Sequence, residues 1–467
     1  MQGKGTSAVE CLRASRYLNA VALGEGKALL YNGRSLCMDV VPSGLADQLL
    51  AVQADLEGLS EAECDHLLRR GHLTRLSPEA EQEEVRQLAE ALAQREMKQA
   101  GHGTSRRMVT FILTYQCNLS CAYCYQADVR AVAGTASMSA PFLDDFFWHQ
   151  LEGLLPGRPE EPVFFQLYGG EPMLPGNREA ITRILAYAAE KGISVSTVTN
   201  AVTIPAMLDL FGSGKGKINI AQVTLDGEQL FHDGQRFSHS GAPTFDQTLR
   251  SVHALVQTGA QVVIRIHVYP GHVQSAQAVV DCLDREGLLG HDQVKVYFWS
   301  TEDLHDQALA PSEFSAFAEL FLAVADRQKA VPTSHFSFLE PILDLEKVDS
   351  LALRNHCSLC VAGLHCVVDP AGDLYECIDD AGRKDRRTGH LEEGSREVLK
   401  PAECHLKPYL CDKPECLACS VALFCGGGCH NRLRTSGPPG SAPFCLQVKD
   451  FIALSLRTSC LLNSGRA

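Results

Sequence analysis

A repeated alternation of strand-like and helix-like segments constrains the fold of this chain more than any other feature. Six runs rich in β-branched and aromatic residues follow one another, each with a helix-like stretch after it. The runs are nearly continuous in apolar residues, as strands buried on both faces are. They read MVTFILT, PVFFQLYG, ISVSTVTN, INIAQVTLDG, QVVIRIHV and QVKVYFWS. Such an alternation predicts a parallel sheet.

The helix-like stretches between these runs set the size of the sheet. They cover about residues 139–154, 177–191, 203–211, 244–258, 273–286 and 312–329. Six strand–helix units are fewer than the eight that close a TIM barrel. We therefore predict an α/β fold in which residues 105–330 form a partial (β/α)6 TIM barrel. Functional side chains are expected at the carboxyl ends of its strands.

Residues 1–104 predict a separate, winged-helix-like module. KALLYNGRSLCMDV reads as a hairpin with Asn32-Gly33 at its turn. Ser60, followed by Glu63, forms a capping box that begins a helix. A further polar helix is expected at about 77–100. The module either caps the barrel or binds a peptide, and the sequence leaves both interpretations open.

Composition excludes some classes of function. The formal net charge of −14 argues against a nucleic-acid surface. We find no apolar run long enough to span a membrane and no apolar stretch typical of a signal peptide. We therefore expect a cytoplasmic location, where cysteines stay reduced. The 19 cysteines then suggest metal binding rather than disulfides.

Three cysteines lie directly after the first strand, in TYQCNLSCAYCYQ. Cys117, Cys121 and Cys124 supply three thiolates, one fewer than the number that normally holds a [4Fe–4S] cluster. One iron would stay open to a small molecule with an amine and a carboxylate. Burial as plain hydrophobic residues fits poorly with Asn118 and Ser120 in the same turn. A zinc site would require a fourth ligand nearby.

The C-x3-C-x2-C triplet, with Tyr123 before its last cysteine, resembles the signature of the radical S-adenosylmethionine (SAM) enzymes. In that family SAM occupies the open iron. Electron transfer then cleaves SAM to methionine and a 5′-deoxyadenosyl radical, which abstracts a hydrogen from the substrate. The resemblance implies SAM and a [4Fe–4S] cluster as cofactors, with the protein positioning both.

Two further motifs lie where this family has them. YGGEP follows the second strand and resembles the GGE motif, with Gly169, Gly170 and Glu171 as candidates for contact with the methionyl ammonium of SAM. VTNAV follows the third strand and resembles the common TNG, with Asn200 kept and Ala201 in place of glycine. The resemblance makes Asn200 another candidate in the SAM site.

The fourth and fifth strands extend the resemblance. VTLDGEQLFHDGQR is similar to the SLDG…HD…R run of peptide-modifying members, and IRIHV is similar to R-x-N-V. By analogy, Thr224, Arg236 and Arg265 are candidates for the SAM carboxylate or ribose, and Tyr123 for the adenine edge. His267 replaces an asparagine, so its role is left open. Each of these residues could instead be an ordinary polar residue at the barrel mouth.

Residues 331–467 are loop-rich and contain most of the cysteines. Their spacing, with DPAGDLYEC and CGGGC, resembles the SPASM domain, which binds two auxiliary [4Fe–4S] clusters. The family pattern gives the first auxiliary cluster Cys360, Cys366, Cys377 and Cys429. It gives the second auxiliary cluster Cys416, Cys419, Cys425 and Cys445. Three [4Fe–4S] clusters are then expected in all.

Three cysteines in this region have no place in the family pattern. They are Cys357, Cys404 and Cys411. Cys357 could displace Cys360 through its C-x2-C spacing, and we interpret the other two as packing residues or spare thiols. A zinc-ribbon interpretation of the C-x2-C pairs is also possible, although the number and order of cysteines disfavour it.

Two acidic residues follow Cys377 in the run IDD. In relatives that oxidise a peptide side chain, an acid just after this cysteine can act as general base. Asp379 and Asp380 are offset by one or two positions, so they are candidates for that role. The alternative is that both are solvated loop residues.

The resemblance implies a radical SAM/SPASM maturase that forms an intrapeptide crosslink, C–C or thioether, in a ribosomally made precursor peptide with a leader. The N-terminal module would hold the leader by β-augmentation. An electron donor such as flavodoxin or ferredoxin is expected as a partner. One alternative is oxidation of a protein residue without crosslinking, as when a sulfatase maturase makes formylglycine. Another is a non-catalytic electron carrier or peptide-binding scaffold. The sequence names neither the substrate nor the oligomeric state.

Overall fold

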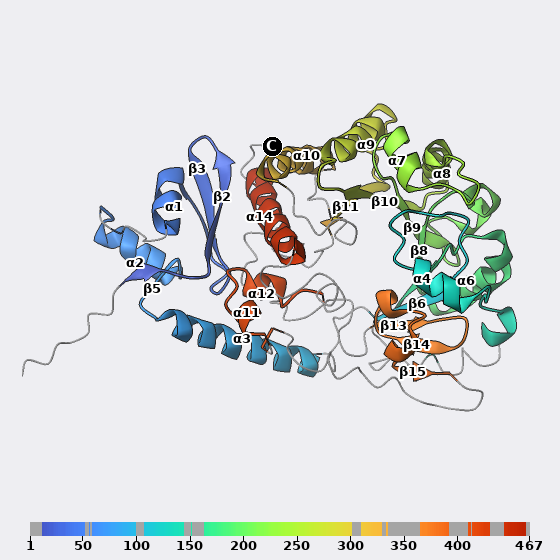
Figure 1. The fold of residues 1–467 in the computed structure, drawn as a ribbon, viewed down its shortest axis with the longest axis horizontal. Helices are drawn as coiled ribbons and strands as arrows, with labels where there is room; N and C mark the ends of the chain where they lie inside the picture. The colour runs from blue at the N-terminus through green and yellow to red at the C-terminus, as the bar shows by residue number, and fades with distance from the viewer. Residues whose placement is uncertain are drawn as a thin grey trace, which may run out of the picture.

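The structure of the chain is a computed structural model. It describes residues 12–51, 56, 58–99, 107–143, 151, 163–300, 310–328, 333–334, 365–391, 410–411, 413–429 and 443–463. The N-terminal module and the barrel lie at opposite sides of the molecule, with the C-terminal helix α14 (Pro443–Asn463) between them (Figure 1). No helix in these ranges is long and apolar enough to cross a membrane.

Six parallel strands form the centre of the barrel sheet, as the apolar runs predicted. Each pairs in parallel with the next along the chain. Their bounds are β6 Arg107–Thr114, β7 Val163–Gly169, β8 Ser194–Thr199, β9 Ile218–Thr224, β10 Gln261–Val268 and β11 Val294–Ser300. Alternate side chains of these strands, such as Phe165 and Leu167, are fully buried in the main hydrophobic core. The predicted parallel α/β arrangement is confirmed.

Helices follow the strands, with two departures from the prediction. Residues 203–211 form two short 3-10 turns, Ile204–Ala206 and Leu208–Leu210, rather than one helix. Their bonds span three residues, as in Met207 N–H to Ile204 O at 2.8 Å, and Met207 leaves helical geometry between them. Two short helices, α4 and α7, were not predicted. The described helices are α4 Ala127–Ala133, α6 Arg178–Lys191, α7 Gln229–Gln235, α8 Phe245–Gln257, α9 Val273–Arg285 and α10 Pro311–Gln328. Most of the predicted 139–154 helix lies outside the described residues.

The C-terminal region adds strands to both ends of the barrel sheet. The resulting ten-stranded sheet has the order β12-β11-β10-β9-β8-β7-β6-β13-β14-β15. The added strands are β12 Thr333–Ser334, β13 His365–Val368, β14 Asp373–Tyr375 and β15 Gly389–His390. Strand β13 pairs in parallel with β6, and β13–β14 is an antiparallel hairpin. Its turn forms because Asp369 Oδ1 accepts bonds from the Ala371 and Asp373 amides, both at 2.9 Å.

The N-terminal module contains a three-stranded antiparallel sheet, β2-β3-β4, and a two-stranded sheet, β1-β5. The predicted capping box at Ser60 and Glu63 is present and begins α2. Strand β2, which pairs with β3, was not predicted. The module's elements are β1 Arg13–Ala14, β2 Leu18–Gly24, β3 Lys27–Asn32, β4 Met38–Pro42, α1 Ser43–Leu50, α2 Glu61–Arg69, β5 Leu73–Thr74 and α3 Pro78–Gln99.

The predicted hairpin is present as β3 and β4, and Asn32-Gly33 lies at the start of its turn. The β3–β4 link spans residues 33–37, and the Asn32 side chain accepts bonds from the Arg34 and Ser35 amides, both at 2.9 Å. Leu36, with φ of 59°, supplies the left-handed residue. The glycine is required for another reason: a Cβ on Gly33 would lie 2.0 Å from the Ser420 carbonyl oxygen.

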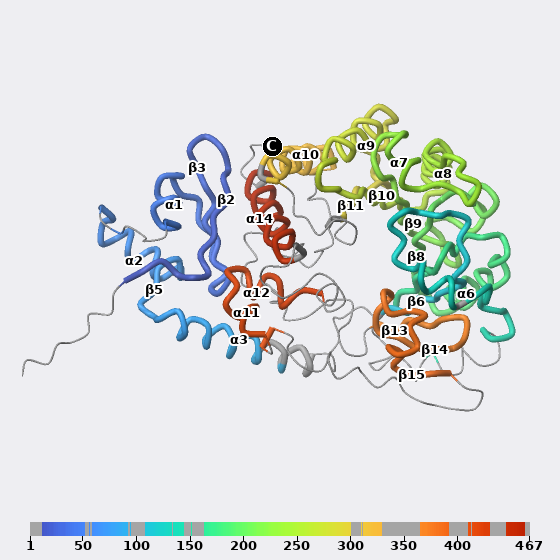
Figure 2. Tube along the Cα trace, in the orientation of Figure 1, coloured from blue at the N-terminus to red at the C-terminus, as the bar shows by residue number. Residues whose placement is uncertain are grey.

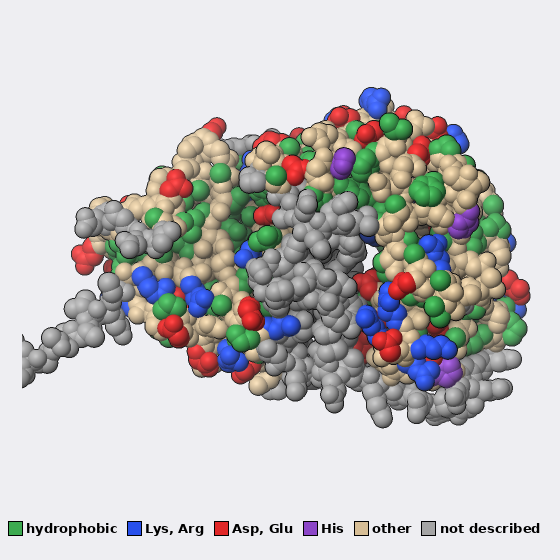
Figure 3. Space-filling view, in the orientation of Figure 1, with side chains coloured by type: hydrophobic (Ala, Val, Ile, Leu, Met, Phe, Trp, Pro, Cys, Tyr) green, Lys and Arg blue, Asp and Glu red, His purple; other side chains and the backbone are tan. Residues whose placement is uncertain are grey.

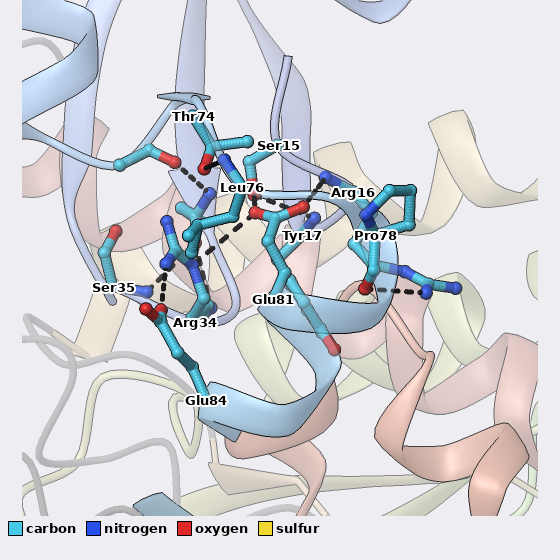
Figure 4. Close-up of polar contacts among 12 residues, drawn as sticks. Ser15, Arg16, Tyr17, Arg34, Ser35, Thr74, Leu76, Pro78, Glu81 and Glu84 are labelled. Carbon is cyan, nitrogen blue, oxygen red and sulfur yellow. Dashed lines mark hydrogen bonds and ion pairs between the residues drawn. The ribbon is translucent and has the colours of Figure 1, made fainter. Parts of the chain in front are cut away.

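A buried carboxylate fixes α3 to the rest of the module (Figure 4). Glu81 is 0% exposed and accepts bonds from Ser15 Oγ at 2.6 Å and Arg13 Nη2 at 2.7 Å. The Arg16 amide donates to it at 3.2 Å, and Arg34 Nε lies 3.6 Å away. Because a buried charge is tolerated only when it is paired and hydrogen-bonded, this network sets where α3 begins.

Acidic and basic side chains are interspersed over the face of the described chain seen in Figure 3, which shows no extended basic surface there. This distribution agrees with the net charge of −14. Neither feature favours nucleic acid as a partner.

Candidate active site

A cavity of about 1110 Å³, part of it open to solvent, lies at the carboxyl ends of the barrel strands. It brings together every barrel residue that the sequence analysis singled out for the SAM or cluster site, and Asp379 from the C-terminal region. These lining residues are Cys117, Cys121, Tyr123, Cys124, Gly169, Gly170, Glu171, Asn200, Thr224, Arg236, Arg265 and Asp379. The position agrees with the rule that barrel chemistry is found at strand carboxyl ends.

The cysteine loop is held against the end of α7 and the segment that follows it. The Ser120 amide donates to Phe237 O at 2.8 Å, and the Ala122 amide donates to Gln235 O at 2.9 Å. The His239 ring bridges two points of the loop, with Nε2 2.7 Å from Cys117 O and Nδ1 2.7 Å from Ser120 Oγ. These contacts fix the backbone that carries the three thiols.

The donor set fits an iron–sulfur cluster better than a single ion. Burial raises the pKa of Cys117 to about 11 and also raises the pKa of Cys121, so thiolates here require a bound cation at neutral pH. In the described residues, no three Cys, His, Asp or Glu side chains lie close enough to hold one metal ion. A cubane cluster does not require three ligands close to one ion, because each thiolate binds a different iron. Three thiols that line one cavity are compatible with such a cluster.

Two glycines, the last residue of β7 and the one after it, allow close contact with the cysteine loop. A Cβ on Gly169 would lie 2.2 Å from Thr114 O, and one on Gly170 would lie 2.2 Å from Gln116 O. The Gly170 amide donates to Thr114 O at 2.8 Å. Side chains are therefore excluded here because the backbone next to Cys117 occupies the space.

Glu171 ties neighbouring loops together. Its carboxylate is 1% exposed and accepts bonds from Thr199 Oγ1 at 2.6 Å, the Asn200 amide at 2.7 Å and the Met173 amide at 2.9 Å. Burial raises the pKa of Glu171, although these three donors oppose the rise. The side chain that we expected to face a ligand ammonium thus already holds the β7 and β8 loops in register.

Asn200 reaches the cysteine loop directly. Its Nδ2 donates to Asn118 Oδ1 at 2.7 Å and lies 3.7 Å from Cys117 Sγ. The next residue, Ala201, has φ of 64°, a left-handed conformation that favours glycine. The family's usual glycine at this position therefore has a backbone explanation.

Four polar side chains form a network deep in the barrel. Tyr123 Oη donates to Asp226 Oδ2 and accepts a bond from Arg236 Nη1. His267 Nδ1 lies 2.6 Å from Asp226 Oδ1. Burial opposes ionisation of Asp226, but His267 and Arg236 hold its pKa well below the usual range. Burial lowers the pKa of His267 to about 4, so we treat His267 as neutral at pH 7 and Arg236 as the cation of the network.

The two acidic candidates separate in the structure. Asp379 lines the cavity, whereas Asp380 Oδ1 is 2.8 Å from Arg386 Nη1 in an ion pair. Both belong to one 3-10 turn, Ile378–Asp380, directly after Cys377. Only Asp379 therefore stands where a substrate in the cavity could meet it.

A second, smaller cavity of about 380 Å³ lies in the C-terminal region. Four cysteines line it, and they are the four that the family pattern assigns to the second auxiliary cluster: Cys416, Cys419, Cys425 and Cys445. Its other lining residues are aliphatic or glycine, namely Leu410, Val421, Ala422, Gly427, Gly428 and Val448. Burial raises the pKa of Cys416 to about 12, and burial also raises the pKa of Cys425 well above its usual value.

The first auxiliary set is only partly described. Cys360 lies outside the described residues, as do Cys357 and Cys404. Cys366 is buried in the main core, and Cys429 packs against that core. Cys377 follows β14, beside the barrel cavity. Their assignment to one cluster stays a prediction.

One of the cysteines without a place in the pattern can be located. Cys411 packs against the main core, with Sγ 3.8 Å from Arg86 O in α3. The packing interpretation fits this residue.

A comparison with known proteins agrees with the geometry. Residues 111–282 match the model of the Radical SAM superfamily. The chain carries a radical SAM domain. This domain begins within β6 and ends within α9, and it therefore contains most of the barrel cavity.

Two curated relatives of this chain are maturases by name. A serine-type anaerobic sulfatase-maturating enzyme of Klebsiella aerogenes is 25% identical over 342 residues, covering 69% of this chain and 78% of that one. Mycofactocin maturase MftC of Mycobacterium ulcerans (strain Agy99) is 26% identical over 369 residues, covering 75% of this chain and 91% of that one.

Solved structures share the fold. Native anSMEcpe with bound AdoMet has a TM-score of 0.59 and 18% identity, covering 77% of this chain and 99% of that one. SuiB of Streptococcus suis has a TM-score of 0.50 and 15% identity, covering 92% and 98%. At these identities the likeness is one of fold, and it agrees with an α/β radical SAM architecture.

Sequence reasoning missed several residues of the barrel cavity. Tyr125 and Tyr168 also line it, with their hydroxyls 3.0 Å apart, and so does Trp299, over which Arg265 stacks at 4.4 Å from the ring centroid. Tyr125 directly follows the last cysteine of the triplet, Tyr168 directly precedes the last residue of the second strand, and Trp299 directly precedes the last residue of the sixth. Closeness to the triplet or to a strand's carboxyl end was the available signal.

Proposed function

We propose that this protein is a radical SAM maturase that oxidises a ribosomally made peptide and forms an intrapeptide crosslink, C–C or thioether. The observation that carries the proposal is the barrel cavity, which the cysteine triplet, the SAM candidates and Asp379 all line. A reaction that starts at a cluster and ends with a proton lost from substrate requires these groups around one space.

The barrel residues would bind and orient SAM. When bound, the cluster and SAM supply a 5′-deoxyadenosyl radical. Of the three described arginines that line the cavity, we assign Arg236 and Arg265, and not Arg130, to a carboxylate. Thr224 offers a hydroxyl to carboxylate or ribose. Glu171 and Asn200 hold the loops around the triplet. Because the Tyr123 hydroxyl is already bonded, an adenine would meet the Tyr123 backbone or ring.

A crosslink requires removal of two hydrogens from the peptide. One leaves as an atom, and the second leaves as a proton and an electron. We assign Asp379 as proton acceptor, since it faces the cavity while Asp380 pairs with Arg386. We assign the electron to auxiliary clusters, the second held by the four cysteines of the small cavity. An electron donor such as flavodoxin or ferredoxin would start the cycle.

A peptide substrate is supported by relatives and by the N-terminal module. The anSMEcpe fold was also solved with bound AdoMet and Cp18Cys peptide, at a TM-score of 0.55. In the module, β4 pairs only with β3 among the described strands, and its Val40 is 53% exposed. An exposed strand edge of this kind can accept an extended leader by β-augmentation.

The test uses the reduced, reconstituted full chain with SAM and a peptide encoded by a short reading frame beside its gene. We expect 5′-deoxyadenosine and a peptide lighter by two hydrogens, with two fragments that stay linked in tandem mass spectrometry. Asp379→Asn should keep 5′-deoxyadenosine formation and lose the crosslinked product, whereas the matched control Asp380→Asn should make product. Absence of 5′-deoxyadenosine in the wild type would contradict the proposal and favour a non-catalytic carrier.

Formylglycine formation is the second candidate, because the Klebsiella aerogenes relative is named for sulfatase maturation. A formylglycine product carries an aldehyde that reacts with a hydrazide probe, and its fragments are not linked. A hydrazide-reactive product without linked fragments would replace the crosslinking proposal with this one.

A further inference from the structure

We propose that the N-terminal module is a structural support for the turn that lines the small cysteine cavity, so that retention of the second auxiliary cluster depends on the module. The inference concerns Tyr17, Asn19 and Gly33, which position the turn that carries Cys416 and Cys419. It rests on the proposed function only in taking that cavity as a cluster site.

The middle strand of the module divides its side chains between two cores. Ala28 and Leu30 of β3 pack in the module's own core with α1 and α2. Leu29 and Tyr31, on the opposite face, belong to the main core together with Cys416 and Phe424. Because alternate residues of a strand point to opposite faces, one strand serves both the module and the cysteine region.

The β3–β4 link touches the cysteine turn at backbone level. A Cβ on Gly33 would lie 2.0 Å from Ser420 O and 2.9 Å from its carbonyl carbon. Ser420 directly follows Cys419. No residue other than glycine fits without moving one of the two backbones, since both contacting atoms belong to main chain.

Side chains of β2 and its preceding residue complete the contact. Tyr17 is fully buried, and its hydroxyl donates to Leu417 O, one residue after Cys416. Asn19 Nδ2 donates to Ser420 O at 3.0 Å. The two carbonyls therefore have their partners in the module, and they flank the segment that contains Cys419.

Helix α3 closes the same region from another side. Arg86 Nη1 donates to Cys411 O at 3.3 Å, and Gln82 Nε2 donates to Pro414 O at 3.3 Å. Figure 2 shows α3 passing along the two short helices α11 (Pro414–Leu417) and α12 (Ala422–Cys425), while β2 runs beside α14. The module thus surrounds the turn between Cys416 and Cys425.

The experiment compares Gly33→Ala with Gly44→Ala in the full chain. Gly44 is the matched control, because a Cβ there meets nothing within 4 Å and its φ is not left-handed. After anaerobic reconstitution, iron and sulfide are counted, and the SAM-sensitive EPR signal is recorded. For Gly33→Ala we expect about 8 irons per chain instead of about 12, with the SAM-sensitive signal kept. Gly44→Ala should keep about 12.

Tyr17→Phe is a milder variant that keeps the core packing. It should retain the cluster at first and lose iron to a chelator about fivefold faster than wild type, as expected for one lost hydrogen bond. An unchanged iron count in Gly33→Ala would overturn the proposal. Loss of the SAM-sensitive signal together with the iron of the second auxiliary cluster would also overturn it. So would a Cys416→Ala/Cys419→Ala variant with the wild-type iron count. None of these readouts depends on peptide product, so failure of the maturase proposal is seen separately.

Discussion

The two cavities are both lined by cysteines, but their other lining side chains differ. The barrel cavity contains three cysteines together with Glu171, Arg236, Arg265 and Asp379. Among the described residues, the small cavity is lined by four cysteines and otherwise by aliphatic or glycine residues. The described lining of the first cavity therefore has groups that can bind and react with a polar ligand, and the described lining of the second has none. Three thiols in a polar space suit a reacting cluster, and four in an apolar space suit an electron carrier.

The largest effect expected from this comparison follows removal of either cysteine set. Cys117→Ala/Cys121→Ala/Cys124→Ala should lower 5′-deoxyadenosine formation by at least about a thousandfold, or about 4 kcal/mol of barrier. Cys416→Ala/Cys419→Ala should leave SAM cleavage within about threefold of wild type while lowering peptide oxidation. Both should lose about four irons. If the second variant loses SAM cleavage as fully as the first, the assignment of different roles to the two cavities is wrong.

The second prediction concerns the carboxylate that orders the polar cavity. Glu171→Ala leaves buried donors from Thr199, Asn200 and Met173 without an acceptor, which we expect to cost about 2–4 kcal/mol in the free energy of unfolding. The matched control is Glu179→Ala on the exposed side of α6, expected within about 0.5 kcal/mol of wild type. Urea unfolding of both variants measures the difference. Equal stabilities would mean that Glu171 does not hold these loops.

The third prediction concerns two carboxyl groups, one in each region, whose pKa values are shifted in opposite directions. Burial raises the pKa of Asp450, on α14 near the small cavity, to about 6, whereas the pKa of Asp226 in the barrel is lowered. A carboxyl with a raised pKa favours the folded state below about pH 4 and loses that contribution as pH rises through about 6. Asp450→Asn should therefore stabilise the protein at pH 7.5 by about 1 kcal/mol, after allowance for solvent screening.

The control is the pH dependence of the stability change in Asp450→Asn. At pH 4 wild-type Asp450 is mostly protonated and resembles asparagine, so the two proteins should unfold at similar urea concentrations. A gain that is the same at pH 4 and pH 7.5 would show that the carboxylate charge is not its source. The paired change Asp226→Asn should instead destabilise at pH 7.5, because the Arg236 cation and the Tyr123 hydroxyl favour the charged form of Asp226.

Local patterns predicted the barrel well and the long-range pairings poorly. The six strands were found within two or three residues of their ends because continuous apolar runs between turns leave few alternatives. The pairing of β13 with β6 joins a four-residue strand to one far earlier in the chain, and no local signal marks it. The short helices α4 and α7 were missed because seven residues hold too little periodicity.

The residues of the candidate site were predicted from local motifs, whereas the contacts that hold them were not. Motif residues at strand ends came together in one cavity because parallel strands present their carboxyl ends at the same edge. What the sequence did not predict is how they are held: Tyr123 bonded to Asp226 and Arg236, His239 across the cysteine loop, and Glu171 between two loops. Such contacts join residues distant in sequence and depend on side-chain geometry. The cluster roles of the C-terminal cysteines stay predictions.

The smallest effect concerns Ala201, a fully buried residue directly after Asn200 of the polar cavity. Its φ of 64° costs an alanine about 1 kcal/mol or more, whereas glycine adopts it freely. Against this gain, glycine loses a buried methyl and adds freedom to the unfolded chain, each worth up to about 1 kcal/mol. We therefore expect Ala201→Gly to lie within about 1 kcal/mol of wild type. The matched control Ala188→Gly, in the interior of α6 and equally buried, gains nothing from strain relief and should cost about 1 kcal/mol more than Ala201→Gly. If both variants lose the same stability in urea unfolding, the left-handed backbone at Ala201 carries no strain, and the glycine usual at this position would need an explanation in the ligand rather than in the fold.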